Sequence, residues 1–385
     1  MPIRCIVMSA SESREIDVAA SSTARAPEAA LPEALSRLAH DLADAGAAPF
    51  HMTAMTWIAP DTAAFHPQRH AIDRLYRETF GGFRPPIRLV PGEPGALTIR
   101  ARAMVPPASE HLDPVWHGLT LPQLARQYSP RNQVPDMRPL FSRWSADGAA
   151  YRSTHGGLDI AFGLSAYETL DYYRPSGVAR PPLWVFIHGG YWQASDKDQH
   201  AQFTAGMVRS GYAAANLNYG LCPDVALEQI TRQVRDALSF LVGEADSFGF
   251  NPAQIHLAGH SAGGHLAAMA AADEAAPAVR SALLLSGLFD LTPLSLLPVA
   301  RLLGILDRNA VERLSPLHHR PRPGVRLGVA VGGLESEEFK WQSTEIATAW
   351  RADACETISG KNHFSLLDGL HDGTLFKLAR DIARS

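Results

Sequence analysis

A serine surrounded by small residues is the strongest chemical signal in this chain. Residues 259–263 read Gly-His-Ser-Ala-Gly, with Ser261 at the centre. A nucleophilic serine at the tip of a sharp strand-to-helix turn needs small neighbours, because larger ones block the strained backbone. An apolar strand over 255–258 and a small-residue helix over 266–272 flank the motif. Five-residue patterns also occur by chance, so the interpretation needs support elsewhere in the chain.

A glycine pair upstream could stabilise the negative charge that such a serine generates. An apolar strand is predicted over 183–187, and His-Gly-Gly-Tyr-Trp follows it at 188–192. Glycines let the main chain approach a developing oxyanion closely. We therefore predict that the backbone N–H groups of Gly190, Tyr191 and Ala262 form an oxyanion hole. The alternative, that the pair merely ends a strand, leaves its place ahead of the serine motif unexplained.

An acid and a histidine follow in the order that a catalytic triad of this type requires. A strand predicted over 325–331 leads into Gly-Gly-Leu and then Glu335. His363 lies in a loop before the last predicted helix, 375–383. In this arrangement His363 takes the proton of Ser261 as general base, and Glu335 fixes the histidine tautomer.

Other residues compete for these roles. The carboxylates that stay open as the acid are Glu337, Glu338 and Asp353. Glu335 is favoured because it lies at the end of the strand. Most of the 16 histidines must be structural. His260 and His265 flank the nucleophile on the wrong side to act as its base, and His318 and His319 lie between prolines in a predicted loop.

From about residue 120 to residue 385 the chain resembles the kynurenine formamidase (arylformamidase) branch of the α/β-hydrolases. The stretches that carry the resemblance, besides 188–193 and 259–265, are Tyr128-Ser129-Pro130-Arg131, Leu170-Asp171-Tyr172-Tyr173-Arg174-Pro175, Asn216-Leu217-Asn218-Tyr219, Ser286-Gly287-Leu288-Phe289-Asp290-Leu291 and Glu337-Glu338-Phe339-Lys340-Trp341-Gln342-Ser343. The chain departs from the animal enzymes at the acid, where it has Glu335 and they usually have aspartate.

The resemblance implies hydrolysis of a small aryl formamide, such as N-formylkynurenine, through an acyl-enzyme. The alternative is a carboxylesterase of broad range acting on short-chain or aryl esters, because this branch also holds esterases. A formyl-sized pocket would reject longer acyl groups. We expect Tyr191, Trp192 and Phe364 to crowd that pocket and to contact the substrate.

Composition sets the class of protein. The chain has 385 residues, 46% of them hydrophobic and 19% charged, which is typical of a globular protein long enough for two domains. A net charge of −4 gives no reason to expect nucleic acid or an anionic membrane as partner. The apolar runs are too short to span a bilayer, and no signal pattern opens the chain. The three scattered cysteines, Cys5, Cys222 and Cys355, predict neither a disulfide framework nor a zinc site. We therefore expect a cytoplasmic enzyme without a metal or cofactor.

The first part of the chain is a separate domain. Strands are predicted over 15–20, 50–58, 87–90 and 96–105, and helices over 31–45 and 66–80. This β-α-β-α-β-β order gives a sheet with both helices on one face. With Arg84-Pro85-Pro86-Ile87-Arg88, the layout resembles the Rid family of enamine/imine deaminases over residues 3–107.

The Rid resemblance implies a chorismate-mutase-like fold, a homotrimer and a substrate carboxylate held by Arg88. Two departures count against deaminase activity: Arg100 lies where active members usually have glutamate, and a glycine-containing loop is absent at 19–22. The domain is then either a scaffold for oligomerisation with a degenerate pocket, or a deaminase or carboxylate-binding site that uses Arg88 and Arg100 together.

These observations predict an α/β protein with two domains. Residues 1–107 form the small α+β domain. Residues 108–385 form an α/β-hydrolase domain, a mostly parallel sheet with helices on both faces. Its first part, to about residue 140, includes a proline-rich segment, 113–139, that we expect to be irregular and to help close the pocket.

Overall fold

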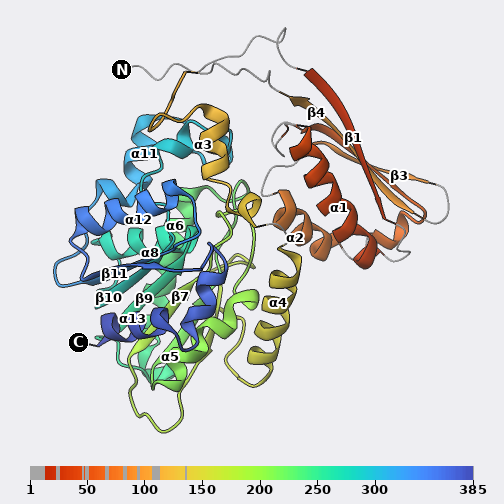
Figure 1. Cartoon of the computed structure of the whole chain (residues 1–385). Coiled ribbons are helices and arrows are strands. Elements are labelled where there is room, and N and C mark those ends of the chain that lie inside the picture. Colours follow the sequence, from red (N-terminus) through yellow and green to blue (C-terminus); the bar gives the residue numbers. More distant parts are fainter. Residues whose placement is uncertain are drawn as a thin grey trace. The chain divides into compact units, whose positions relative to one another are not determined.

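The computed structural model describes residues 14–22, 27–45, 47, 52–65, 69–80, 85–92, 96–105, 113–134 and 137–384. The chain divides into two compact units, Met1–Asp113 and Pro114–Ser385. We expected a boundary after residue 107. Figure 1 shows the helices and strands of both units.

The N-terminal unit is a four-stranded sheet with two helices. Its elements are β1 (Arg14–Ser22), α1 (Pro27–Asp44), β2 (Met52–Ala59), the 3-10 turn η2 (Ala63–Phe65), α2 (Arg69–Phe80), β3 (Ile87–Pro91) and β4 (Leu97–Val105). The strand order is β1-β4-β2-β3, and only the β2–β3 pair is parallel. Leu35 of α1, Tyr76 of α2 and Ile99 of β4 belong to one core, so both helices cover the same face. Residues 50, 51 and 66–68 of the predicted elements lie outside the described residues.

The second unit contains an eight-stranded sheet with the order β12-β11-β10-β9-β7-β8-β6-β5. The strands are β5 (Ile160–Ala161), β6 (Thr169–Tyr173), β7 (Leu183–Ile187), β8 (Ala213–Leu217), β9 (Ile255–His260), β10 (Ser281–Leu285), β11 (Arg326–Gly332) and β12 (Ala354–Ile358). The pairs from β8 to β12 are parallel, and β6 and β5 join antiparallel. The predicted strand over 183–187 is confirmed as β7.

Helices cover both faces of this sheet (Figure 1). The α-helices are α3 (Leu121–Gln127), α4 (Arg138–Ser153), α5 (Ala205–Arg209), α6 (Leu227–Gly243), α7 (Ala245–Phe248), α8 (Ala262–Ala272), α9 (Thr292–Ser295), α10 (Val299–Leu303), α11 (Arg308–Leu314), α12 (Glu337–Trp350) and α13 (Thr374–Ala383). The 3-10 turns are η3 (Pro130–Gln133), η4 (Asp198–Thr204), η5 (Pro316–His318) and η6 (Ser365–Leu370). One core joins α6, α8 and α12 to the sheet, and the other joins α4, α5 and α13.

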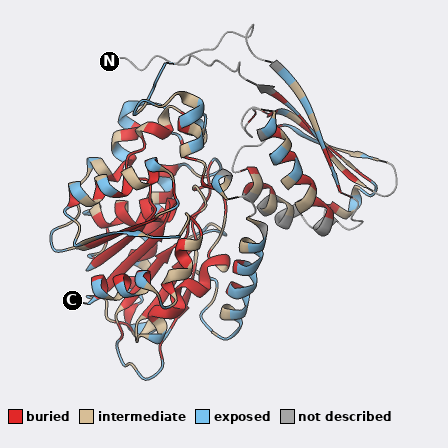
Figure 2. Cartoon of the chain, viewed as in Figure 1, coloured by how far each residue is buried: buried red, intermediate tan, exposed pale blue. Residues whose placement is uncertain are grey.

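Burial explains why the central strands are mostly apolar. Every residue of β7, β8, β9 and β10 is buried, as Figure 2 shows in red. Because helices cover both faces of these parallel strands, no position faces solvent, and apolar residues do not alternate with polar ones. Because the strands are parallel, their carboxyl ends lie at the same edge of the sheet, where an open α/β sheet places its ligands.

The segment 113–139 is more regular than we predicted. It contains α3 and η3. Thr120 and Gln123 form a capping box at the start of α3, and a proline lies in the first turn, where its missing N–H removes no helical hydrogen bond. Proline richness here marks the start of a helix rather than its absence. Across the described residues, no helix has both the length and the apolar character needed to cross a bilayer.

Candidate active site

Ser261 lies at a strained turn between β9 and α8. Its backbone has φ 56° and ψ −118°, values that a non-glycine residue rarely adopts. A Cβ at Gly259 would collide with the carbonyl of Gly263, and a Cβ at Gly263 would collide with the carbonyl of Ile187. Both glycines of the motif are therefore required by close packing around the serine.

The structure brings Glu335 and His363 into direct contact. His363 Nδ1 lies 2.6 Å from Glu335 Oε2, and the two side chains are only 5% and 1% exposed. The other carboxylate oxygen, Oε1, accepts hydrogen bonds from Ser286 Oγ at 2.5 Å and from the backbone N–H of Gly332 at 2.7 Å. The carboxylate is thus held from both sides with one oxygen directed at the imidazole.

His260 connects the serine turn to the loop of the histidine. Its Nε2 donates to the carbonyl of His363 at 2.7 Å, and the two rings lie 4.7 Å apart. Burial, and next the nearby His363, lowers the pKa of His260 well below its usual value, so the ring stays neutral. Within the described residues no hydrogen bond joins the hydroxyl of Ser261 to the ring of His363. Such bonds often tighten only when substrate binds.

The competing acids lie in other environments. Glu337 is 82% exposed on its side chain and pairs with Lys340. Asp353 accepts from the N–H of Leu327 and pairs with Arg326. Glu338 is buried, and its partners are Trp116, His117 and Tyr128. None of these carboxylates contacts His363 among the described hydrogen bonds.

The competing histidines have structural partners. His265 Nε2 donates to the carbonyl of Leu314, and His319 Nε2 donates to that of Arg313. His318 ends the 3-10 turn η5. The rings of His265 and His319 are thus held by backbone carbonyls.

The loop after β7 has positive backbone φ angles at three successive residues. Gly190 has φ 111°, and Tyr191 and Trp192 have φ 57° and 56°. A Cβ at Gly189 would come within 3.3 Å of the Ser261 Cβ, so this loop lies against the nucleophile turn. Within the described chain, none of the hydrogen bonds uses the N–H group of Gly190, Tyr191 or Ala262. These three donors are free to serve an oxyanion.

The side chains predicted to crowd the substrate differ in position. Phe364 is 8% exposed, and its ring stands edge-on to the His363 ring at 5.1 Å. Burial raises the pKa of Tyr191 above its usual range. Trp192 is fully buried, and its ring packs edge-on against His265 at 4.9 Å. Contact between Trp192 and a substrate stays a prediction, and this structure exposes no part of that side chain.

A buried ionic cluster holds the loop that follows these residues. Lys197 Nζ lies 2.8 Å from Asp171 of β6 and also pairs with Asp198. Arg152 Nε donates to the same Asp171 at 2.8 Å. Asp171 is fully buried and Lys197 nearly so, and each charge is balanced by more than one partner in the cluster. The cluster therefore anchors the chain just beyond residues 188–192 to the sheet.

The contacts of Ser286 with Glu335 and of His260 with His363 were not predicted from the sequence. Ser286 directly follows β10 and has a left-handed φ of 46°. It opens one of the stretches that carry the formamidase resemblance, which was the available signal. In the N-terminal unit, Arg88 and Arg100 are both exposed and both lie opposite Thr56 in register, so they share one cross-strand row.

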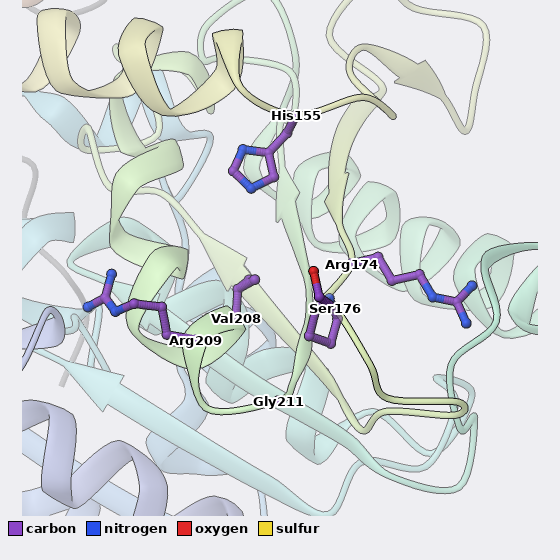
Figure 3. Close-up of a pocket in the computed structure, with 7 residues that line it drawn as sticks. His155, Arg174, Ser176, Val208, Arg209 and Gly211 are labelled. Atoms are coloured by element: carbon purple, nitrogen blue, oxygen red, sulfur yellow. The ribbon is translucent and has the colours of Figure 1, made fainter.

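The structure has a cleft elsewhere in the second unit (Figure 3). It is lined by His155, Arg174, Pro175, Ser176, Val208, Arg209 and Gly211. Figure 3 shows the guanidinium groups of Arg174 and Arg209 pointing away from each other. They donate to the carbonyls of Phe248, Ala179 and His371 instead. None of the candidate triad residues lines this cleft. No group of three His, Cys, Asp or Glu side chains among the described residues is arranged to hold a metal ion.

Comparison with known proteins agrees with this fold. Residues 170–284 match the BD-FAE family model. The kynurenine formamidase of Danio rerio is 28% identical over 67% of this chain and 94% of its own length. A candidate thioesterase of Silicibacter, known from its crystal structure, has a TM-score of 0.61 at 29% identity and covers 66% of this chain and 98% of its own.

This protein is a hydrolase of the α/β-hydrolase fold. A second relative of the hydrolase, the kynurenine formamidase of Salmo salar, is 26% identical over the same shares of both chains. Esterase B of Lactobacillus rhamnosis is similar in fold, with a TM-score of 0.51 at 18% identity over 66% of this chain and 95% of its own.

The hydrolase is expected to lose stability as the pH falls from about 6.5 to about 4. Burial lowers the pKa of His256 and His265 to about 4 and that of His200 to about 3, and it also lowers those of His188 and His260. In this window the unfolded chain binds protons that the folded chain does not, at about 1.4 kcal/mol per pH unit for each group.

Urea unfolding of the hydrolase at several pH values tests this prediction. The unfolding free energy should decline below pH 6.5, and the decline should be shallower in His256→Gln, which removes one of these groups. A stability that is constant between pH 6.5 and 4, or the same slope in the variant, would contradict the prediction.

Proposed function

We propose that this hydrolase cleaves a small aryl formamide, such as N-formylkynurenine, through an acyl-enzyme on Ser261. The observation that carries the proposal is the 2.6 Å contact between His363 Nδ1 and Glu335, beside the strained serine turn. The substrate class rests on the relatives named kynurenine formamidase, which align along nearly their whole length.

The proposed reaction has two halves. His363 Nε2 takes the hydroxyl proton of Ser261 as Oγ attacks the formyl carbon, and the oxyanion is stabilised by the N–H groups of Gly190, Tyr191 and Ala262. His363 then returns the proton to the leaving nitrogen, which releases the aryl amine and leaves formyl-Ser261. A water molecule, deprotonated by His363, attacks the formyl carbon, and formate leaves as Ser261 regains its proton.

Glu335 supports both halves without itself reacting. A carboxylate accepts from Nδ1–H, which fixes the tautomer in which Nε2 is free to accept a proton. It also stabilises the imidazolium that forms in each half. Ser286 and Gly332 keep the carboxylate in this orientation.

A carboxylesterase is the second candidate. The same nucleophile and oxyanion donors attack an ester, and a carboxylic ester hydrolase of Mycobacterium tuberculosis, LipN, is 34% identical over 26% of this chain. The two candidates differ in the room left for the acyl group. We propose that Tyr191 and Phe364 restrict it to formyl size.

Rates on matched substrates decide between the candidates. We would compare kcat/KM for N-formylkynurenine, N-acetylkynurenine and p-nitrophenyl acetate and butyrate. The formamidase proposal expects the formamide to be preferred, with the acetamide nearly inert. Fast ester cleavage with negligible formamide turnover would overturn it in favour of the esterase.

For the N-terminal unit we propose a Rid-like, chorismate-mutase-like module that forms a homotrimer. The order β1-α1-β2-α2-β3-β4 and the single helical face support the fold, and the trimer rests on the Rid resemblance alone. Arg88 and Arg100, unpaired within the described residues, are candidates to bind a substrate carboxylate. A cytoplasmic location is proposed because the three scattered cysteines have no spacing that predicts a disulfide framework. Sedimentation as a monomer would overturn the trimer.

A further inference from the structure

Two sequence stretches that the proposed reaction does not use meet in the structure. Tyr128 and Glu338 are 210 residues apart, yet Tyr128 Oη donates to Glu338 Oε2 at 3.0 Å. Gln342 Nε2, one turn further along α12, donates to the same Tyr128 Oη at 2.9 Å. All three side chains are buried. The segment that carries α3 is therefore attached to α12 through a polar cluster that water scarcely reaches.

Glu338 is the centre of this cluster. Trp116 Nε1 donates to Oε2 at 2.9 Å, and His117 Nδ1 donates to Oε1 at 2.9 Å. With Tyr128, three donors from one segment surround one carboxylate that is 6% exposed. A buried carboxylate is retained at low cost only when its oxygens are satisfied in this way.

Phe339 lies between this cluster and His363, the candidate base. The Phe339 ring lies 4.7 Å from the His363 ring in an edge-on arrangement, and 5.9 Å from the Tyr128 ring. Ser336, the N-cap of α12, accepts from the N–H of Phe339 and donates to the carbonyl of Gln127. Phe339 is thus fixed between the α3 segment on one side and the imidazole on the other.

We propose that Glu338 is a positioning residue for His363: with Tyr128 and Gln342, it locks the first turn of α12 so that Phe339 braces the imidazole. The inference rests on the proposed function, in which His363 is the base. Burial raises the pKa of Tyr128, and the neighbouring Glu338 raises it further, so the phenol keeps its proton and continues to donate.

Two substitutions at Glu338 distinguish a role of its hydrogen bonds in positioning from a role of its negative charge. In Glu338→Gln, the amide oxygen accepts from Trp116 and Tyr128, and the NH₂ group donates to His117 in its other tautomer. In Glu338→Met, a side chain of similar length removes the acceptor of all three donors, and Tyr128 keeps only the hydrogen bond that it accepts from Gln342. We expect the methionine variant to lower kcat about 10- to 100-fold with KM nearly unchanged, since small displacements of a catalytic group cost that much. The glutamine variant should restore kcat to within about 3-fold of wild type.

Glu337→Gln and Glu337→Met are the matched controls, because that neighbouring side chain is exposed. Both should keep the wild-type kcat. If Glu338→Gln were as damaging as Glu338→Met, the role would be electrostatic and the positioning proposal would be wrong. It would also be wrong if Glu338→Met lowered thermal stability alone and left kcat unchanged.

A readout without substrate keeps this test independent of the proposed function. The proton between His363 Nδ1 and Glu335 gives a low-field NMR signal in a short hydrogen bond. Glu338→Met should shift or broaden that signal, and the Glu337 variants should not. If Glu338→Met fails to fold, Tyr128→Phe removes only one hydroxyl and should still alter the signal. An unaltered signal in the folded variant would overturn the inference, even if wild type proves inactive on formamides.

Discussion

The Ser261→Ala variant is expected to lose at least about 10⁴-fold in kcat on every substrate that the wild-type protein hydrolyses. The nucleophile is removed, and what remains is stabilisation by the free N–H groups of the oxyanion loop. Alanine adds no atoms to the strained turn, so the fold should be retained. Steady-state rates with N-formylkynurenine and p-nitrophenyl acetate, together with circular dichroism, measure both effects.

Ser239→Ala is the matched control for this loss. Ser239 is an exposed serine on α6 whose hydroxyl donates to the carbonyl of Arg235. Its substitution should leave kcat unchanged. If Ser261→Ala kept more than a tenth of the wild-type rate in a folded protein, the acyl-enzyme mechanism on this serine would be excluded.

The Glu335→Gln variant is expected to lower kcat by about 10⁴-fold. The amide oxygen can keep the hydrogen bonds from Ser286 and Gly332, which places the NH₂ group opposite His363 Nδ1. His363 must then accept at Nδ1 and carry its proton on Nε2. In that tautomer it cannot take the proton of Ser261, so the geometry survives while the base is disabled.

Glu337→Gln serves as the control for Glu335→Gln, since it makes the same chemical change two residues away on an exposed side chain. It should retain the wild-type rate. A Glu335→Gln variant with more than a tenth of the wild-type kcat would reject Glu335 as the acid. Glu338 would then be the remaining buried carboxylate of this region to test.

Sequence alone predicts the order and the elements of the candidate triad because the local rules are strong. Small residues around Ser261, and strands that end at Ile187 and Gly332, are visible as short-range patterns. Choosing Glu335 over its neighbours is harder, since three glutamates lie within four positions. The deciding fact is that Ser336 caps α12: Glu335 precedes the helix and faces His363, whereas Glu337 and Glu338 lie within its first turn.

Local sequence patterns do not predict contacts between distant parts of the chain. Ser286 holds Glu335 across 49 residues, and Tyr128 meets Glu338 across 210. In neither pair does the position of one residue in the sequence predict the position of the other. Trp192 is a related case. An aromatic residue beside the glycine pair favours a contact with the substrate. In the structure the Trp192 backbone is left-handed, and its ring packs against His265 in the core.

The N-terminal unit illustrates how alternation predicts a sheet without predicting its task. Apolar and basic residues alternate along β4, and the apolar set shares one core with α1 and α2. The same alternation places Arg100 and Arg102 on the other face. Arg102 pairs with Glu15, while Arg100 has no such partner within the described residues.

Labelling with a fluorophosphonate tests the central claim, that Ser261 is a nucleophile activated by His363, most directly. Intact-mass and peptide mass spectrometry of the full chain should find one adduct, on the peptide that contains Ser261. Labelling should be absent in Ser261→Ala and strongly slowed in Glu335→Gln. An adduct on another residue, or undiminished labelling of Ser261→Ala, would contradict the account.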